Sequence, residues 1–158
     1  MKIAICDDDI FWRKQIIVFL NEYISTKNQD ISVTVYEHGE NLIDDVLKTG
    51  GFDVYILDIM MPGINGIDLG LSLRKSDLDG KILYLTSSED FAIDAFKAKA
   101  FNYILKPVEK ESFFLALDDI LGSKAEKSLI VKSKEGSIKI PLDSILYAEL
   151  VKRSIVYH

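Results

Sequence analysis

The sequence predicts an α/β fold in which a doubly wound parallel β-sheet carries helices on both of its faces. The first observation behind this prediction is that short apolar runs alternate with segments of helical periodicity along residues 1–122. The second is that the apolar runs lack alternating polar residues, as expected for strands that are buried on both faces. Because parallel strands are joined by right-handed crossovers, the alternation places helices on both sides of the sheet.

We expect five strands and five helices in alternation. The strand segments are Lys2–Cys6, Ile31–Tyr36, Val54–Leu57, Ile82–Leu85 and Phe101–Leu105. The helical segments are Ile10–Ile24, 42–47, Ile67–Leu73, Ala92–Phe96 and Phe113–Leu121. In the first helix, Ile16, Phe19 and Leu20 fall on one apolar face. Gly50 and Gly51 are expected to end the second helix.

Composition excludes several classes of protein. Of the 158 residues, 48% are hydrophobic, and the formal net charge is −6, which is typical of a folded domain rather than a disordered chain. No apolar stretch approaches the roughly 20 residues that cross a bilayer. Three aspartates near the N-terminus interrupt any signal-peptide apolar region, and Cys6 has no partner for an internal disulfide. We therefore expect a cytoplasmic protein without a membrane partner.

Charge divides the chain into two parts. Residues 1–122 carry 12 basic and 21 acidic side chains, whereas residues 123–158 carry 7 basic and 4 acidic ones. The change falls in the small polar stretch 123–127, which is typical of a linker. We therefore expect a first domain at 1–122, a linker at 123–127 and a second unit at 128–158.

Acidic side chains follow two of the expected strands. Asp7 and Asp8 follow the first strand, and Asp58 follows the third. If the sheet order is 2-1-3-4-5, these strands are neighbours, and their carboxylates repel one another unless a cation joins them. Oxygen ligands favour Mg²⁺ or Mn²⁺, so we expect Asp8, Asp58 and the backbone carbonyl of Met60 to bind the metal. Asp7 would bind it directly or through water, whereas Asp9 is more typical of a helix N-cap.

Polar residues also follow the fourth and fifth strands. Thr86 and Ser87 come after the fourth, and Lys106-Pro107, a pair that can take the cis form, comes after the fifth. Taken singly, Thr86 is equally typical of a hydroxyl that bonds local backbone, and Lys106 of a solvated charge. Tyr103 alone is equally typical of core packing. The arrangement of these residues, rather than any one of them, indicates a functional site.

The stretch Asp58-Ile59-Met60-Met61-Pro62-Gly63-Ile64-Asn65-Gly66 is the most diagnostic one. Because of this stretch and the features named below, the sequence resembles the receiver domain of two-component response regulators over about residues 1–122. The matching features are the acidic cluster, Asp58 with its Met-Met-Pro-Gly loop, Thr86 followed by the small Ser87, Tyr103, and Lys106-Pro107.

This resemblance implies a flavodoxin-like (βα)5 fold and assigns a role to each matching residue. Asp58 would accept a phosphoryl group, Lys106 would contact that group, and Thr86 with Tyr103 would form the switch. Asp7 and Asp8 would be the metal carboxylates. The resemblance also implies a sensor histidine kinase as partner, a homodimer on activation, and a signalling switch rather than a turnover enzyme.

Residues 128–158 form a short β-rich fragment that resembles the beginning of a LytTR-type DNA-binding domain. The expected strand segments are Leu129–Lys132, Ser137–Ile140, Ser144–Tyr147 and Ile155–Tyr157. The resemblance rests on Ile140–Glu149, the Lys152-Arg153 pair that follows it, and the aromatic segment Ala92–Tyr103, which is taken as helical.

The resemblance implies transcriptional regulation through DNA. Lys152 and Arg153 would contact phosphates, although they are equally typical of exposed hairpin residues. DNA binding would require the complete output domain, because this chain stops after the first few strands. Unpaired apolar strands tend to pair with another chain, so we expect 128–158 to fray or to pair between molecules.

A second function class also uses an acidic motif after the first strand. Magnesium-dependent phosphatases of the haloacid dehalogenase type would employ Asp7 as nucleophile, with Thr86 and Lys106 as the hydroxyl and lysine motifs. That interpretation needs an acidic pair after a strand, whereas Asp118-Asp119 falls within an expected helix. It also leaves the Asp58 loop unexplained. A flavodoxin-like flavin binder is excluded, because aspartates after the first strand would repel the flavin phosphate.

Overall fold

The computed structural model describes residues 1–76, 79–122, 128–133, 136–141, 148–151 and 154–157. They belong to two compact units, Met1–Ile120 and Leu121–His158, which we describe separately. The linker expected at 123–127 lies outside the described residues. No helix in the described part of the chain has both the length and the apolar composition needed to cross a membrane.

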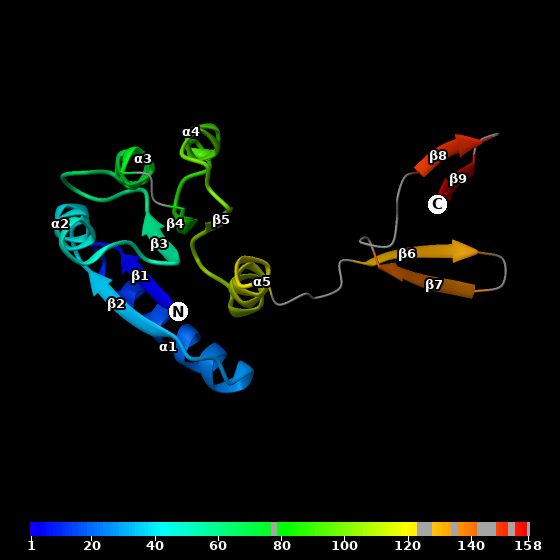
Figure 1. The fold of residues 1–158 in the computed structure, drawn as a ribbon, viewed down its shortest axis with the longest axis horizontal. Coiled ribbons are helices and arrows are strands. Elements are labelled where there is room, and N and C mark those ends of the chain that lie inside the picture. Colours follow the sequence, from blue (N-terminus) through cyan, green and yellow to red (C-terminus); the bar gives the residue numbers. More distant parts are fainter. Residues whose placement is uncertain (77–78, 123–127, 134–135, 142–147, 152–153, 158) are drawn as a thin grey trace. The chain divides into compact units, whose positions relative to one another are not determined.

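The first unit contains one five-stranded parallel sheet in the order β2-β1-β3-β4-β5 (Figure 1). The strands are β1 (Lys2–Cys6), β2 (Ser32–Tyr36), β3 (Val54–Asp58), β4 (Lys81–Thr86) and β5 (Asn102–Leu105). The strand order expected from the sequence is confirmed. Cys6 in β1 lies opposite both Tyr36 in β2 and Leu57 in β3. This register brings the carboxyl ends of β1 and β3 side by side.

Five helices cover the two faces of this sheet. They are α1 (Ile10–Lys27), α2 (Gly39–Thr49), α3 (Gly66–Lys75), α4 (Ala92–Lys97) and α5 (Lys110–Ile120). α1 packs beside α5 on one face, and α2, α3 and α4 pack in sequence on the other (Figure 1). α4 ends at Lys97 and Tyr103 lies in β5, so the expectation of helix continuing to Tyr103 is wrong.

The boundaries of the helices follow from local chemistry. The Asp9 carboxylate accepts a hydrogen bond from the Phe11 N–H at 2.7 Å and forms the N-cap of α1. Asn65 caps α3 in the same way through the Asp68 N–H. α2 ends at Gly50, whose φ of 87° lies in a region that side chains other than glycine rarely adopt.

The core of the unit lies on both sides of the sheet. All five residues of β3 are buried, as expected for a central parallel strand. In β1, Ala4 and Cys6 belong to the apolar cluster formed with α2 and α3. On the α1 side, Ile16 and Leu20 are buried as expected from the helical period. The strand ends are thereby fixed in place, and their last residues form one edge of a rigid sheet.

Among its described residues, the second unit contains two antiparallel pairs of strands. The strands are β6 (Ser128–Ser133) with β7 (Gly136–Pro141), and β8 (Ala148–Val151) with β9 (Ser154–Tyr157). β6, β7 and β9 cover three expected strand segments, whereas β8 was not expected. The remaining predicted segment, Ser144–Tyr147, lies outside the described residues, as do Lys152 and Arg153. Pairing of these strands between molecules stays a prediction.

Candidate functional site

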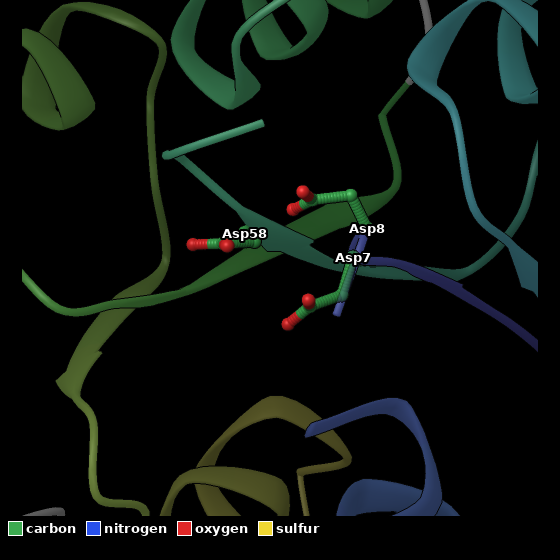
Figure 2. A group of neighbouring side chains, drawn as sticks. All are labelled: Asp7, Asp8 and Asp58. Carbon is green, nitrogen blue, oxygen red and sulfur yellow. The ribbon is translucent and has the colours of Figure 1, made fainter. Parts of the chain in front are cut away.

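Three carboxylates lie together at the carboxyl ends of β1 and β3. One oxygen each of Asp7, Asp8 and Asp58 lies within 4.8 Å of the other two. Asp7 and Asp58 are buried, and Asp8 is half-buried. Figure 2 shows the three side chains extending toward the same side of the strand ends. The structure therefore brings together the acidic residues that the sequence suggested.

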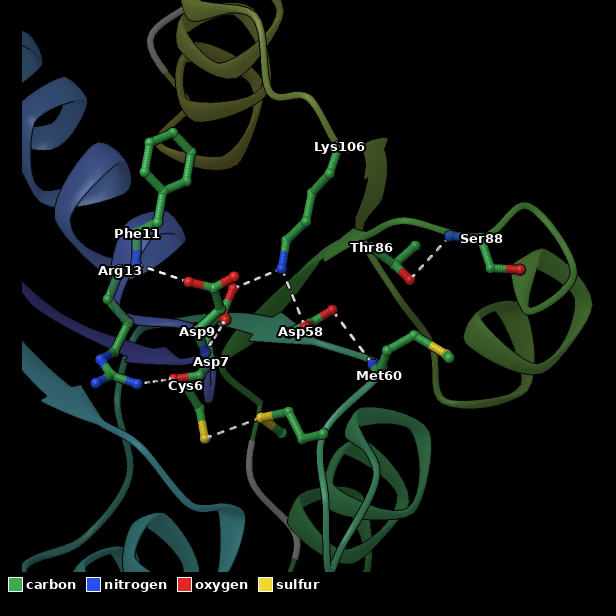
Figure 3. Close-up of polar contacts among 11 residues, drawn as sticks. Cys6, Asp7, Asp9, Phe11, Arg13, Asp58, Met60, Thr86, Ser88 and Lys106 are labelled. Atoms are coloured by element: carbon green, nitrogen blue, oxygen red, sulfur yellow. Dashed lines mark hydrogen bonds and ion pairs between the residues drawn. The ribbon is translucent and has the colours of Figure 1, made fainter.

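A buried ammonium group joins two of these carboxylates (Figure 3). Lys106 follows β5, and its Nζ lies 2.7 Å from Oδ2 of Asp7 and 3.0 Å from Oδ2 of Asp58. Only 4% of the Lys106 side chain is exposed, so the usual interpretation of a solvated surface charge does not apply. The Lys106-Pro107 peptide bond is cis. Lys106 therefore offsets part of the repulsion within the acidic cluster.

Asp7 is held by three polar contacts around the end of β1. Its Oδ1 accepts a hydrogen bond from the Asp9 N–H at 2.9 Å, and its Oδ2 accepts one from Lys106. Arg13 of α1 donates to the Asp7 carbonyl at 2.6 Å, which ties the helix to the strand end. Burial raises the pKa of the Asp7 carboxyl, while the Lys106 hydrogen bond and charge oppose that rise.

Cys6 precedes the acidic cluster but takes no part in it. The thiol is fully buried and lies 3.7 Å from the sulfur of Met61. Burial, followed by the charge of Asp7, raises the pKa of the Cys6 thiol to about 12. At neutral pH the thiol is protonated and packs in the core, so it does not serve as a nucleophile.

The loop after β3 fixes the position of Asp58. Its Oδ1 accepts a hydrogen bond from the Met60 N–H at 3.2 Å, and the Gly66 N–H donates to the Ile59 carbonyl at 3.0 Å. A Cβ added at Gly66 would lie 2.0 Å from the Asp58 carbonyl oxygen, well inside contact distance. Glycine is therefore required where the loop returns to the strand. The metal contact expected of the Met60 carbonyl stays a prediction.

Thr86 and Tyr103 both bind the loop that follows β4. Thr86 is fully buried at the end of β4, and its hydroxyl accepts a hydrogen bond from the Ser88 N–H at 3.4 Å. Tyr103 is half-buried in β5, and its hydroxyl donates to the Ser88 carbonyl. Ser87, between these contacts, is exposed. The two residues that the sequence paired as a switch therefore meet at Ser88.

One further residue at the site, and one at the amino ends of β4 and β5, were not expected from the sequence. The Trp12 ring of α1 lies beside the Lys106 ammonium, with 5.3 Å between Nζ and the ring centroid. Arg74 of α3 donates to the carbonyls of Gly80, Ala98 and Lys99 at 2.8, 3.3 and 3.2 Å. These contacts join residues that are far apart in the sequence, so no local sequence pattern predicts them.

The chemistry of the donor atoms fits a hard divalent cation. Carboxylate oxygens are the ligands that Mg²⁺ and Mn²⁺ prefer, and Asp7, Asp8 and Asp58 supply three of them in one cluster. Lys106 provides a single positive charge against these three negative ones. These three aspartates are therefore the residues that would hold the ion.

The acidic pair near the end of the first unit lies elsewhere. Asp118 belongs to α5, and its carboxylate accepts a hydrogen bond from the Tyr23 hydroxyl at 2.7 Å. It also forms an ion pair with Lys27 at 2.9 Å. Asp118 therefore joins α5 to α1 and does not follow a strand, as a phosphatase of the haloacid dehalogenase type would require.

Comparison with known proteins agrees with the fold. Residues 3–118 match the family model described as the response regulator receiver domain. The sensory transduction protein LytT of Oceanobacillus iheyensis is 30% identical over 143 residues, which cover 89% of this chain and 56% of LytT. The transcriptional regulatory protein LytR of Staphylococcus aureus is 26% identical over 150 residues, or 95% of this chain and 59% of LytR. The chain thus spans little more than half the length of these relatives.

A solved structure shows the same fold with a ligand present. It is the response regulator TrrA from Thermotoga maritima in complex with Mg²⁺ and BeF. The two proteins are 26% identical and superpose with a TM-score of 0.64 over 75% of this chain and 97% of TrrA.

Proposed function

Because the chain belongs to the response regulator receiver domain family, we propose that Asp58 accepts a phosphoryl group from a sensor histidine kinase. One observation carries this proposal: the buried Lys106 ammonium lies between Asp7 and Asp58, beside the cluster of three carboxylates. The response regulator TrrA, which has the same fold, was solved in complex with Mg²⁺ and BeF, and this supports Mg²⁺ as the metal of the proposed site. Each chain would carry one phosphoryl group as a signal rather than turn over a substrate.

The residues present suit transfer of a phosphoryl group to a carboxylate. An oxygen of Asp58 attacks phosphorus in line, the P–N bond to the kinase histidine breaks, and the imidazole leaves with the electron pair. Lys106 neutralises charge on the equatorial oxygens, and the Thr86 hydroxyl donates a hydrogen bond to them. Mg²⁺, when bound to the acidic cluster, supplies the remaining positive charge that these oxygens need.

Phosphorylation would act on the loop after β4. The negative phosphoryl group attracts the Thr86 hydroxyl, which contacts Ser88 in this structure. Tyr103 holds the same residue through its carbonyl, so a shift of Ser88 reaches the β5 and α4 surface. The phosphoryl group therefore biases a two-state equilibrium of this face.

The relatives suggest what the switch controls. LytR of Staphylococcus aureus is a transcriptional regulatory protein, and the chain is similar to it over residues of both units. We therefore propose a LytTR-type output that binds DNA when complete, with phosphate contacts from Lys152 and Arg153. Homodimer formation on activation would place two output domains on the DNA.

Intact-protein mass spectrometry with acetyl phosphate tests the site directly. Wild type in MgCl2 should gain the mass of one phosphoryl group, and EDTA should prevent that gain. Asp58→Ala should remain unmodified, whereas Asp44→Ala, which removes an exposed carboxylate of α2, should behave as wild type. Asp7→Ala should react more slowly but still on Asp58.

The same experiment distinguishes the proposed function from the phosphatase alternative, in which Asp7 is the nucleophile. Phosphorylation of Asp58→Ala together with its absence in Asp7→Ala would identify Asp7 as the nucleophile. A wild type that stays unmodified with Mg²⁺ present would contradict the proposed function, and only the fold would stand.

A further inference from the structure

We propose that Trp12 is a positioning residue that holds the Lys106 ammonium at the acidic cluster during phosphoryl transfer. This inference rests on the proposed function of Asp58 and Lys106. Its basis is the contact between the Trp12 ring and Nζ of Lys106, with 5.3 Å from Nζ to the ring centroid. A cation within about 6 Å of an indole centroid is attracted by the negative face of the ring.

Trp12 is itself firmly attached to the acidic cluster. α1 begins at Ile10, directly after the Asp9 cap, and the Arg13 guanidinium donates to the Asp7 carbonyl at 2.6 Å. The Phe11 ring packs edge-on against the Trp12 indole, with 5.1 Å between centroids. Trp12 is half-buried, so the first turn of α1 carries the indole in a fixed relation to Asp7.

A neutral aromatic ring is suited to this task because it attracts the ammonium without neutralising its positive charge. Asp7 and Asp58 hold Nζ through their own negative charges. Once Asp58 carries a phosphoryl group, Lys106 has to donate hydrogen bonds to the phosphoryl oxygens. The carboxylates compete for the same N–H donors of the ammonium. The indole face still attracts the cation, so it limits the rotamers of a long side chain and keeps the ammonium available for transfer.

The first measurement is the rate of Asp58 phosphorylation by acetyl phosphate at saturating MgCl2, which needs no kinase docking surface. Trp12→Leu should lower the rate constant by about three- to tenfold, because it keeps an apolar side chain but removes the ring. Trp12→Phe should lie between Trp12→Leu and wild type, since a phenyl ring attracts cations more weakly. Val18→Ala shortens an apolar side chain of the same helix that is 60% exposed, and it should leave the rate unchanged.

A double-mutant cycle with Lys106→Met separates positioning from a general structural effect. If Trp12 acts through Lys106, Lys106→Met and the double variant with Trp12→Leu should react at rates within about twofold of each other. Urea unfolding of Trp12→Leu, Trp12→Phe and Val18→Ala gives the stability of each variant. If Trp12→Leu fails to fold, Trp12→Phe carries the test alone.

Fluorescence tests the contact without any reaction. Trp12 is the only tryptophan of the chain, so emission reports on its surroundings alone. Lys106→Met should shift that emission, whereas Lys14→Met, which removes an exposed charge from the same helix, should not.

The outcomes distinguish this inference from the proposed function. Equal rates for Trp12→Leu and Val18→Ala, or additive losses in the double-mutant cycle, would overturn the role of Trp12 while wild type is phosphorylated normally. A wild type that gains no phosphoryl group on Asp58 would instead overturn the proposed function itself.

Discussion

Lys106 is the residue on which the electrostatics of the site depend. Its ammonium and the Asp7 and Asp58 carboxylates are 4 to 6% exposed, so water screens their charges poorly. A buried ion pair contributes little net stability, but removal of one partner leaves uncompensated charge behind. The two aspartates are therefore tolerable in the folded protein because Lys106, or a metal ion, accompanies them.

Replacement of this lysine should reveal that dependence. Lys106→Met should lower the free energy of unfolding by about 3 kcal/mol in EDTA, because two buried carboxylates lose their cation. MgCl2 should restore part of the loss, since a cation that binds only the folded site stabilises it. Urea unfolding followed by circular dichroism measures both effects.

A lysine in a more exposed ion pair provides the comparison. Lys27 pairs with Asp118 and is 39% exposed, so Lys27→Met should cost less than about 1 kcal/mol. Equal losses for the two variants, or no response of Lys106→Met to MgCl2, would contradict the account given for Lys106.

At the scale of elements, α1 and α5 are joined by a polar contact that depends on pH. The Tyr23 hydroxyl, and then the Lys27 ammonium, stabilise the Asp118 carboxylate and hold its pKa below the ordinary value. The folded protein therefore binds this proton less readily than the unfolded chain does. The resulting stabilisation is present above the ordinary carboxyl pKa and is lost as pH falls through the lower pKa of the folded state.

Asp118→Asn should show this pH dependence as a difference from wild type. The variant should lose about 1 kcal/mol of unfolding free energy near neutral pH, and the difference should shrink below about pH 4. Tyr23→Phe, which removes the hydroxyl donor, should reproduce part of the same profile. Urea unfolding at several pH values measures the difference, and a loss that persists at low pH would contradict the assignment.

α4 is the shortest helix of the first unit, and a side chain from α3 holds its C-terminal end. Arg74 donates to the carbonyls of Ala98 and Lys99, which follow α4, and to that of Gly80 before β4. Arg74→Met should lower the free energy of unfolding by about 2 kcal/mol, because carbonyls would lose charged donors. Hydrogen exchange should accelerate at the amides of residues 98–100.

Lys75 gives a matched control for this variant. It is the next residue of α3 and is exposed, so Lys75→Met should leave both stability and exchange near wild-type values. Unchanged protection of residues 98–100 in Arg74→Met would show that α4 is held by other contacts.

For the whole molecule, the sheet and both helical layers are complete within Met1–Ile120. A chain that ends at Gly122 should therefore unfold at the same urea concentration as the full chain. It should also be phosphorylated by acetyl phosphate at the same rate. A lower rate in the shorter chain would show that residues 123–158 contribute to the site.

Features of the fold that depend on local patterns could be predicted from the sequence. Strand β1 was predicted at its observed bounds because the four residues after Lys2 are apolar, and they are buried as expected of a central strand. Asp58 and Asp7 were placed together because the strand order brings two carboxyl ends side by side. The hairpin strand β8 was missed, since its segment shows no clear alternation and short strands have weak signals.

Features that depend on pairwise contacts between distant residues could not be predicted. Trp12 and Lys106 lie far apart in the chain, and only the tertiary fold brings them together. Arg74 likewise meets Lys99 through tertiary structure alone. Such contacts are set by side-chain directions in three dimensions, which periodicity does not encode.

Gly66 is a position at which any amino-acid substitution should disturb the site. Every mutation that replaces this glycine adds at least one carbon atom, and that atom would lie 2.0 Å from the carbonyl oxygen of Asp58, the proposed phospho-acceptor. Alleles at this codon should therefore silence the switch although every charged or hydroxyl-bearing residue stays intact. If Asp58 accepts the phosphoryl group as proposed, a position without any side chain is as necessary for that reaction as the carboxylate beside it.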